Sequence, residues 1–353
     1  MTGSSVEPAP VTVAVDANGA DLGPAEVAAG AAVAAGTGTR VLLFGPAAQL
    51  GPAPAGVTVI DAPVSIAKAP GPVAAVRATP EASIVQAARA VAAGEADALV
   101  AGGSTGAAVA AALFNVKRAR GVYRPALAIE VPVPGAPVLM LDIGANVEVR
   151  PEHLVQFAFL GAAFSTGVLG VSRPRVALLS NGAEPSRGTP DLVAAHADLE
   201  AGAPYAGMEF VGNVEGTDVT AGAADVVVTD GFTGNVAIKL MEGVSQTVLG
   251  AIRAVAETST RSRAGGLLLR PGLHDFRAGI DPERSGGAHI LGLRRLGVVP
   301  HGRFTRVGYA SAIAVAERGV RERVVERTQA ALEAAGALRR APSAATASVP
   351  DVP

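Results

Sequence analysis

Short apolar runs alternate with Ala-rich stretches along most of the chain. Eight of these runs are rich in β-branched residues and apolar throughout, which predicts strands of a sheet that is covered on both faces. They are residues 11–17, 40–45, 57–62, 96–103, 126–132, 137–144, 175–182 and 224–231. The stretches between them read as the covering helices. The pattern predicts a three-layer α/β/α sandwich with a mainly parallel sheet over residues 11–338, with room for two lobes around a cleft.

Polar residues follow five of the predicted strands. The junctions are DANGAD (16–21), GGSTGA (102–107), DIGAN (142–146), SNGAE (180–184) and DGFTGN (230–235). Gly and Asn are ordinary turn residues, and Ser, Thr and Asp are ordinary helix N-caps, so each junction alone has a purely structural explanation. Five such junctions on one edge of a parallel sheet predict a shared cleft that binds an anion.

A long helix is expected to begin at residue 231, and its apolar face repeats every four residues: Val236, Leu240, Val244, Val248 and Ile252. A segment follows in which Leu267, Leu268 and Leu269 are flanked by Arg. We expect a helical hairpin over residues 232–285 whose tip dips into an anionic membrane surface or packs on a second copy of the chain. A last helix is expected from about residue 307 to 338, and residues 341–353 read as a disordered tail.

Composition and missing motifs narrow the classes of function. A net charge of -2 gives no reason to expect nucleic acid, and the absence of cysteine excludes an acyl-cysteine intermediate. The histidines lack metal-ligand spacing, and neither a P-loop, a complete dinucleotide fingerprint nor a G-x-S-x-G elbow occurs, so neither metal nor cofactor is expected. The N-terminus lacks a signal-peptide pattern, and GGSTG interrupts the uncharged stretch 98–116, so we expect a cytoplasmic protein.

Seven longer segments occur together in the order expected of one family. They are VAVDANGADLGP, ADALVAGGSTGA, RPALA, LDIGANVEVRPEHLVQFAFLG, LLSNGAEPSRG, FVGNVEGTDVTAGAADVVVTDGFTGNVAIKLMEG and GGAHILGLRRLGVVPHG. In these segments the chain resembles the bacterial phosphate acyltransferases of phospholipid synthesis, the PlsX family of acyl-acyl carrier protein:phosphate acyltransferases. The resemblance covers roughly residues 11–318.

The resemblance implies a fold related to phosphotransacetylases and isopropylmalate dehydrogenases. It also implies a homodimer, peripherally associated with the inner face of the cell membrane. The implied reaction transfers a fatty acyl group from acyl carrier protein to inorganic phosphate. The acyl phosphate would then pass to a membrane glycerol-3-phosphate acyltransferase for phosphatidic acid synthesis.

The implied reaction needs positioning more than acid–base catalysis. Phosphate is partly a dianion near neutral pH, and a thiolate leaves readily because a thiol has a pKa of about 8.5. The site must hold phosphate and aim donors at the oxyanion of the tetrahedral intermediate. We predict four catalytic residues: Asn146, Asn213, Lys239 and His301. We predict phosphate or substrate binding by Asp16, Asn18, Gly19, Ser104, Thr105, Gly106, Gly144, Asn181, Glu184, Arg187, Glu215, Asp230 and Asn235.

These residues have different expected roles. The oxyanion donor is expected among Asn146, Asn213 and Asn235, and the cation that neutralises phosphate is Lys239 or Arg187. His301 could donate a proton to the leaving sulfur or to phosphate, or be a buried histidine bonded to backbone. Carboxylates repel phosphate, so Glu184, Glu215 and Asp230 are assigned support roles.

The chain departs from the family pattern at several positions. The first motif usually reads D-A-M-G-G-D, whereas Asn18 and Ala20 stand here, and Ala20 narrows the backbone conformations open to that turn. Ser104 replaces the Asn of G-N-T-G, and the segment VRATPEAS keeps only Arg77 and Ser83 of a basic, serine-containing stretch. Two alternatives stay open: a phosphotransacetylase-like enzyme using acyl-CoA, and a non-catalytic, membrane-associated paralogue. A dehydrogenase has support only from fold analogy.

Overall fold

The computed structural model describes residues 9–133, 135, 137–202, 207–279 and 281–339. Within these residues eleven strands form one sheet in the order β3-β2-β1-β4-β11-β10-β5-β6-β9-β7-β8. The strands are β1 (Thr12–Asp16), β2 (Arg40–Gly45), β3 (Val57–Asp61), β4 (Ala98–Ala101), β5 (Ala126–Val131), β6 (Val138–Leu141), β7 (Arg175–Leu179), β8 (Glu209–Val214), β9 (Val226–Val228), β10 (Ala288–Leu291) and β11 (Leu296–Val299).

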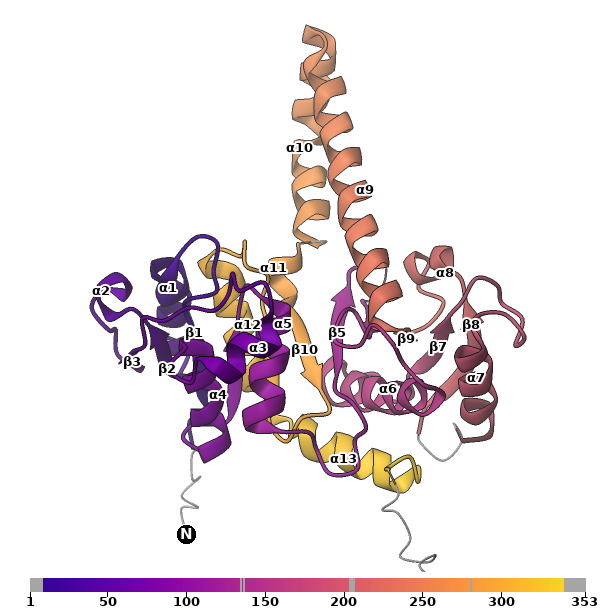
Figure 1. Ribbon diagram of the computed structural model, residues 1–353. Coiled ribbons are helices and arrows are strands. Elements are labelled where there is room, and N and C mark those ends of the chain that lie inside the picture. The colour runs from indigo at the N-terminus through magenta and orange to yellow at the C-terminus, as the bar shows by residue number, and fades with distance from the viewer. Residues whose placement is uncertain (1–8, 134, 136, 203–206, 280, 340–353) are drawn as a thin grey trace, which may run out of the picture.

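Helices connect most of these strands and cover the sheet (Figure 1). The α-helices are α1 (Pro24–Ala35), α2 (Ala47–Leu50), α3 (Pro72–Ala78), α4 (Ser83–Ala93), α5 (Thr105–Ala111), α6 (Pro151–Phe164), α7 (Pro190–Gly202), α8 (Gly216–Thr220), α9 (Gly231–Glu257), α10 (Thr260–Gly279), α11 (Pro282–Ser285), α12 (Arg306–Arg321) and α13 (Val324–Ala334). Two short π-helical turns, η1 (Ala112–Val116) and η2 (Ser165–Leu169), extend α5 and α6.

The α/β fold with a mainly parallel sheet is confirmed, but the sheet contains two parallel sets of strands. Strands β3, β2, β1, β4 and β11 are parallel, and so are β6, β9, β7 and β8. Between the sets, β11–β10, β10–β5 and β5–β6 are antiparallel, so the two sets run in opposite directions. The prediction that all five polar junctions follow strands of one parallel set is therefore wrong, because DANGAD and GGSTGA follow the first set and the other three follow the second.

All eight predicted strands are present, whereas β8, β10 and β11 were not predicted. Gly212 interrupts β8, Gly297 interrupts β11, and β10 contains His289, so none of the three is an uninterrupted apolar run. The expected last helix is two helices, α12 and α13. The chain turns between them at Arg323, whose φ of 55° lies outside the helical region.

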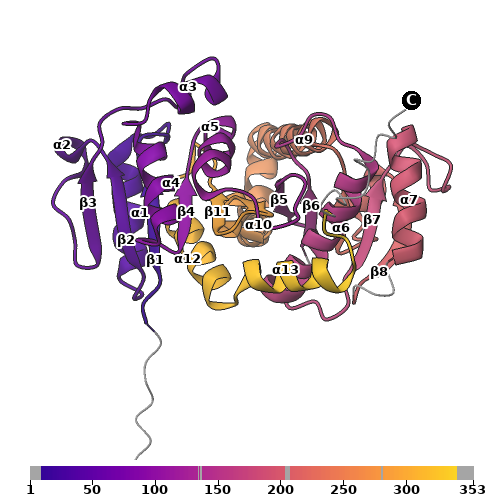
Figure 2. The same cartoon turned by 60° about the horizontal axis from the view of Figure 1, so that its bottom comes forward.

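Each half of the sheet is packed on both faces. In the first half, α1 and α12 cover one face, while α4 and α5 cover the other. In the second half, α6, α7 and α13 bury one face, and α8 packs on the opposite face. Figure 2 shows α13 lying across the seam between the halves, where it packs on α6. The halves therefore share a continuous sheet and a common covering helix.

Helices α9 and α10 form a hairpin that projects from the middle of the molecule (Figure 1), here called the stalk. At 1.5 Å per residue, the 27 residues of α9 span about 40 Å. Only Gly231 and Gly234 of α9 are buried, so the body contacts just its first turns. The apolar face predicted for this helix, from Val236 to Ile252, is exposed on the single chain.

The leucines expected at the tip lie within α10. The helices meet at Thr258 and Ser259, and Leu268, two turns into α10, is 84% exposed. Gly266 lets the helices cross closely, because a Cβ there would lie 3.0 Å from the Cβ of Ala256. Within the described residues no helix combines the length and apolar character needed to cross a bilayer. The tail predicted at residues 341–353 lies outside the described residues.

Candidate functional site

The loops that follow β1, β4 and β11 touch one another. They are residues 16–21, 102–106 and 300–303, here called the first loop set. A Cβ on Gly19 would lie 1.8 Å from the carbonyl oxygen of Gly102, and one on Gly103 would lie 2.0 Å from that of Gly19. The N–H of Asp21 donates to the carbonyl of Gly302 at 2.8 Å. Only residues without a side chain permit this approach, so the glycines of two predicted junctions are required by their contact.

Asp16 lies beneath the first loop set and is 3% exposed. Its Oδ1 accepts a hydrogen bond from the N–H of Asn18 at 3.2 Å, and the hydroxyl of Ser83 also bonds its carboxyl group. Burial raises the pKa of Asp16 to about 6, and these two hydrogen bonds act in the opposite direction. Asp16 can therefore hold or release a proton close to neutral pH.

A narrow, closed pocket lies beside Asp16 and has no room for a water molecule. Its lining includes the hydroxyl-bearing residues Ser65, Ser83 and Ser104 together with Gly102. The side-chain amide of Asn18 donates to Ser83 Oγ at 3.1 Å and fixes this wall. The walls of this closed pocket thus combine hydroxyl groups, backbone and one buried carboxyl group, and these groups could bind an oxyanion that carries a proton only after the walls move apart. No motif surrounds Ser65, so the sequence alone does not indicate it.

Tyr309 of α12 supports the same loops from below. Its hydroxyl is buried and has no hydrogen-bond partner among the described residues. A Cβ on Gly102 would lie 2.2 Å from that hydroxyl, so Gly102 also makes room for the tyrosine. Burial, with the charges of Asp16 and Asp21, raises the pKa of Tyr309 and keeps it protonated. Tyr309 lies far from these loops in the chain, so the sequence alone does not connect it with them.

Other predicted residues of the first loop set occupy its rim. Ser104 caps α5, with Oγ accepting from the N–H of Ala107 at 3.3 Å, and Thr105 and Gly106 form the first turn. His301 is exposed, and its Nδ1 accepts from the N–H of Arg303 at 3.2 Å, so the buried alternative is excluded.

Ala20 does not strain the DANGAD loop. Among described residues other than glycine, positive φ occurs only at Lys117 and Arg323, so the backbone at Ala20 needs no glycine.

Asp142 organises the loop after β6. This residue is fully buried, and Oδ1 accepts from the N–H groups of Leu127, Gly144 and Ala145 at 2.9, 3.1 and 3.0 Å. Its Oδ2 accepts from the backbone N–H of Asn146 at 2.7 Å. Burial raises the pKa of Asp142, while these hydrogen bonds favour its charged form. The DIGAN loop is thus wrapped around one carboxylate.

Residues 142–146 and 230–235 form a second loop set. The side-chain amide of Asn146 donates to Pro125 O at 2.7 Å and to Asp142 Oδ2 at 2.8 Å, which uses both hydrogens. The structure therefore gives Asn146 a positioning role in place of the predicted oxyanion donor. Asp230 likewise caps α9, its Oδ1 accepting from the N–H groups of Phe232 and Thr233.

Asn235 is exposed over the second loop set. Its Nδ2 donates to Ile143 O at 3.2 Å and would lie 3.1 Å from a Cβ on Gly144. One hydrogen of this amide has no described partner, so Asn235 retains a free donor. Lys239 follows one turn later on the same helix and is exposed. Of the predicted oxyanion donors, Asn235 fits best because its amide is both placed and available.

The remaining predicted residues form a third loop set, residues 180–188 and 213–216. Asn213 donates to Glu184 O at 2.8 Å, and its Oδ1 lies 2.9 Å from His196 Nδ1, so its amide is used structurally. Glu184 pairs with Arg187 at 3.3 Å on an exposed surface. Glu215 caps α8, and Asn181 is exposed. We find a structural role for Asn213 and Glu215, and solvent exposure for the other three.

One apolar cluster joins the first and second loop sets. It contains Ala107 and Ala108 of α5 together with Ile143, and Ala145 and Ile238 pack against it. Helix α5 begins at the first loop set, and α9 begins at the second (Figure 1). The same apolar cluster therefore extends to both loop sets, even though their strands run in opposite directions.

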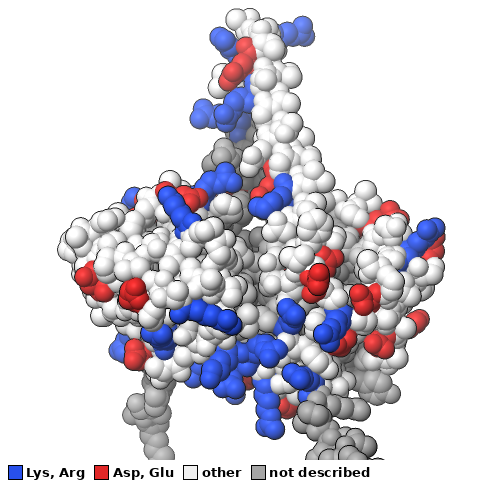
Figure 3. All heavy atoms as spheres, viewed as in Figure 1, with Lys and Arg blue, Asp and Glu red and all other residues white. Residues whose placement is uncertain are grey.

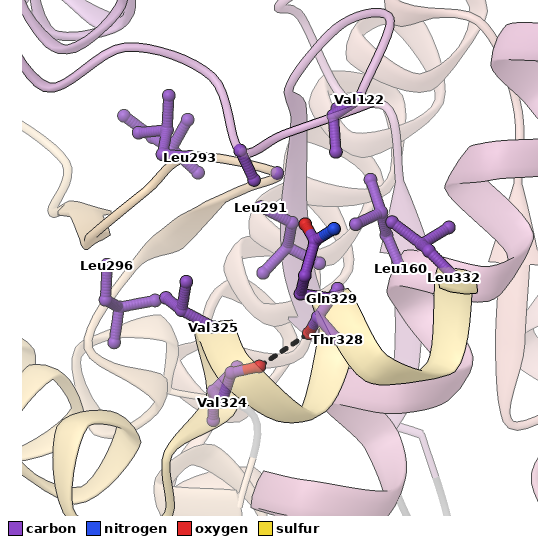
Figure 4. A pocket seen from close by; sticks show the side chains of 13 residues that line it. Val122, Leu160, Leu291, Leu293, Leu296, Val324, Val325, Thr328, Gln329 and Leu332 are labelled. Carbon is purple, nitrogen blue, oxygen red and sulfur yellow. Dashed lines mark hydrogen bonds between the residues drawn. The ribbon is translucent and has the colours of Figure 1, made fainter. Parts of the chain in front are cut away.

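A different pocket lies under α13 (Figure 4). Aliphatic side chains such as Leu291, Leu296 and Leu332 line it, and its polar Thr328 already donates to Val324 O at 2.7 Å. It offers no titratable group for acyl or phosphoryl chemistry. Among the described residues no group of three His, Asp or Glu is placed to hold a metal ion. The two joined loop sets are therefore the candidate site.

Comparison with known proteins shows the family of the chain. The profile of the family described as fatty acid synthesis protein matches residues 11–327. The chain belongs to this family. It is 42% identical over 233 residues to the phosphate acyltransferase of Anaeromyxobacter dehalogenans strain 2CP-1, which covers 66% of this chain and 63% of the relative. It is 40% identical over 215 residues to that of Thermotoga maritima, covering 61% and 64%. These alignments thus span less than two thirds of each relative's length.

Solved structures share the fold at low sequence identity. A phosphotransacetylase from Streptococcus pyogenes superposes with a TM-score of 0.60 at 18% identity, covering 88% of this chain and 94% of that one. The EutD phosphotransacetylase from Staphylococcus aureus gives 0.57 at 17% identity, with the same coverage. The predicted fold relationship to phosphotransacetylases is confirmed.

Proposed function

We propose that this protein transfers a fatty acyl group from acyl carrier protein to inorganic phosphate, releasing acyl phosphate for phospholipid synthesis. The family match over residues 11–327 and the phosphate acyltransferases among its relatives support acyl transfer to phosphate. The observation that carries the proposal is the contact between the loops after β1 and β4, where Gly19 and Gly103 approach without side chains. Loops joined in this way present backbone and the Ser104 hydroxyl around the pocket at Asp16.

In the proposed reaction phosphate binds at the first loop set. A phosphate oxygen attacks the thioester carbonyl carbon, and the carbonyl electrons move onto oxygen. The intermediate then collapses, the carbon–sulfur bond breaks, and the thiolate leaves and takes up a proton. In this proposal His301, which is exposed at the rim, supplies that proton, and Asp16 holds the phosphate proton during binding.

The second loop set would stabilise the transition state. The free hydrogen of Asn235 Nδ2 is the proposed oxyanion donor, and Lys239 supplies positive charge one turn away. Asp142 and Asn146 hold the loop without touching substrate. Because donors fixed by packing need no rearrangement during the reaction, such a rigid loop favours catalysis.

The test is acyl phosphate formation from long-chain acyl carrier protein, with and without phosphate, beside the same assay with acyl-CoA. Phosphate-dependent product from the carrier substrate supports the proposal. Product from acyl-CoA alone favours a phosphotransacetylase-like enzyme. No product from either donor favours the non-catalytic paralogue.

Assembly and membrane contact extend the proposal. We propose a homodimer that binds the membrane surface peripherally and delivers acyl phosphate to a membrane glycerol-3-phosphate acyltransferase. The exposed apolar residues of the stalk, including Leu240 and Leu268, support a contact with lipid or with a second copy. Sedimentation and vesicle flotation would distinguish these partners.

A further inference from the structure

Six cationic side chains gather on two loops outside the candidate site. They are Lys117, Arg118, Arg120, Arg124, Arg294 and Arg295, here called the basic patch, and all are exposed. Figure 3 shows Lys and Arg concentrated across the lower part of this face, with few acidic side chains among them. Within the described residues none of the six makes an ion pair. The whole chain has a net charge of -2, so this clustering does not follow from composition.

The two loops of the basic patch are tied together. Arg118 forms a β-bridge with Leu293, and the N–H of Arg294 donates to Lys117 O at 3.0 Å. The side chain of Arg294 also donates to Arg118 O at 3.2 Å. Lys117 has a φ of 72°, a conformation that a lysine rarely adopts. The cations therefore stand on a fixed surface.

The basic patch borders the candidate site. Arg124 directly precedes Pro125, whose carbonyl accepts the hydrogen bond from Asn146 at 2.7 Å. Two residues further on, the N–H of Leu127 donates to Asp142 at 2.9 Å. A partner held at the patch would thus lie beside the second loop set.

We propose that the basic patch docks an acidic protein, and that this protein is the carrier of the acyl thioester; this inference rests on the proposed function. A row of unpaired cations complements an acidic protein surface and accelerates its association. A membrane is the weaker fit, because the strongly exposed leucines lie on the stalk and not in the patch. The nearby exposed Phe114 is covered by Arg77, whose guanidinium carbon lies 4.5 Å from the ring centroid.

The test compares two double variants of equal charge. Arg120→Glu/Arg295→Glu reverses two patch cations whose side chains make no described hydrogen bond. Arg40→Glu/Arg173→Glu reverses two exposed cations outside the patch. We expect KM for acyl carrier protein to rise by about tenfold in the patch variant, with kcat within about twofold, because surface charges act mainly on association. The control variant should match the wild type.

Two further acyl donors distinguish a loss of docking from damage to the candidate site. Acyl-CoA and the uncharged acyl-pantetheine should react equally with both variants wherever the wild type accepts them. Raising the salt concentration should increase the wild-type KM for the carrier and leave that of the patch variant nearly constant. An unchanged carrier KM, or an equal loss with every donor, overturns the inference.

Direct measurement of carrier binding tests the docking surface even if no acyl donor reacts. Fluorescence anisotropy of labelled acyl carrier protein measures its affinity for each variant without catalysis. Wild-type inactivity would refute the proposed function, while patch-dependent carrier binding would still support the docking surface. Loss of binding to anionic vesicles with unchanged carrier binding would instead assign the patch to lipid.

Discussion

Asn146 and Asp142 fix each other within one loop. The amide of Asn146 donates to Asp142 Oδ2 at 2.8 Å, and its other hydrogen goes to Pro125 O at 2.7 Å. A side chain whose two donors are already used cannot also bind an oxyanion. The pair instead holds the loop that leads into α6 against Pro125, the residue before β5.

Replacing Asn146 with Ala should therefore destabilise the protein. The change leaves Pro125 O and one lone pair of Asp142 without a donor inside the protein, which typically costs about 1–3 kcal/mol per buried group. Urea unfolding would measure the loss of unfolding free energy. The neighbouring Val147→Ala, at a side chain 68% exposed, serves as control and should change stability little. Equal effects of the two substitutions would contradict the assigned role.

Gly103→Ala tests whether the loops after β1 and β4 must touch. Gly103 has a φ of 91° and Gly23 one of 90°, so alanine would have an unfavourable positive φ at both positions. At Gly103 the new Cβ would lie 2.0 Å from Gly19 O, whereas nothing lies within 4 Å at Gly23. We expect Gly103→Ala to lower kcat/KM for phosphate at least about tenfold, a transition-state loss of about 1.4 kcal/mol or more. Gly23→Ala should lower stability by about 1–3 kcal/mol, because its backbone (φ 90°, ψ 167°) lies in a region that is essentially restricted to glycine, without affecting kcat/KM for phosphate comparably. Similar kinetics for both variants would rule out the loop contact as a requirement.

Asp16 makes stability depend on pH in a predictable direction. Its pKa is raised from 3.8 to about 6 in the folded protein, so between these values the folded state binds more protons than the unfolded state. Stability therefore falls as pH rises from about 4 to about 6. The side chain of Asp16→Asn does not titrate, so the variant lacks this loss. Its free energy of unfolding relative to wild type should therefore rise by up to about 3 kcal/mol between pH 4 and pH 7.5.

Unfolding of wild type and Asp16→Asn at the two pH values checks this prediction, with the exposed Asp198→Asn as control. The control should show no comparable change. We also expect Asp16→Asn to weaken phosphate binding, since the amide cannot accept the phosphate proton. If the stabilities of wild type and Asp16→Asn differ by the same amount at pH 4 and at pH 7.5, the pKa of Asp16 is not raised in the folded protein.

Leu268→Glu tests the membrane role of the stalk. Leu268 is 84% exposed on α10, and a charge at a lipid-facing position opposes insertion. We expect the variant to be released from anionic vesicles in flotation while its activity in solution stays within about twofold of wild type. Val33→Glu adds the same charge to α1, where Val33 is 56% exposed on the body, and should leave flotation unchanged. If Leu268→Glu floats with vesicles as well as wild type does, the stalk leucines do not contact the membrane.

The sequence determined the elements that local pattern controls. Apolar β-branched runs specify eight of the eleven strands in the described part of the chain, and the four-residue apolar repeat specifies α9, because burial on a sheet or a helix face selects those periods. The segments shared with the family also contain the loops of the candidate site, which are DANGAD, GGSTGA, DIGAN and DGFTGN. Their glycines are needed for backbone contacts that a motif can encode.

Only the tertiary structure decided how these loops combine. The antiparallel strands β10 and β5 reverse the sheet between its halves, and no local signal in their short sequences announces this reversal. The tertiary contacts also decided that Asn146 and Asn213 are consumed in holding loops while Asn235 keeps a free hydrogen. An amide has the same chemistry in every case, and its availability depends on acceptors that come from distant parts of the chain.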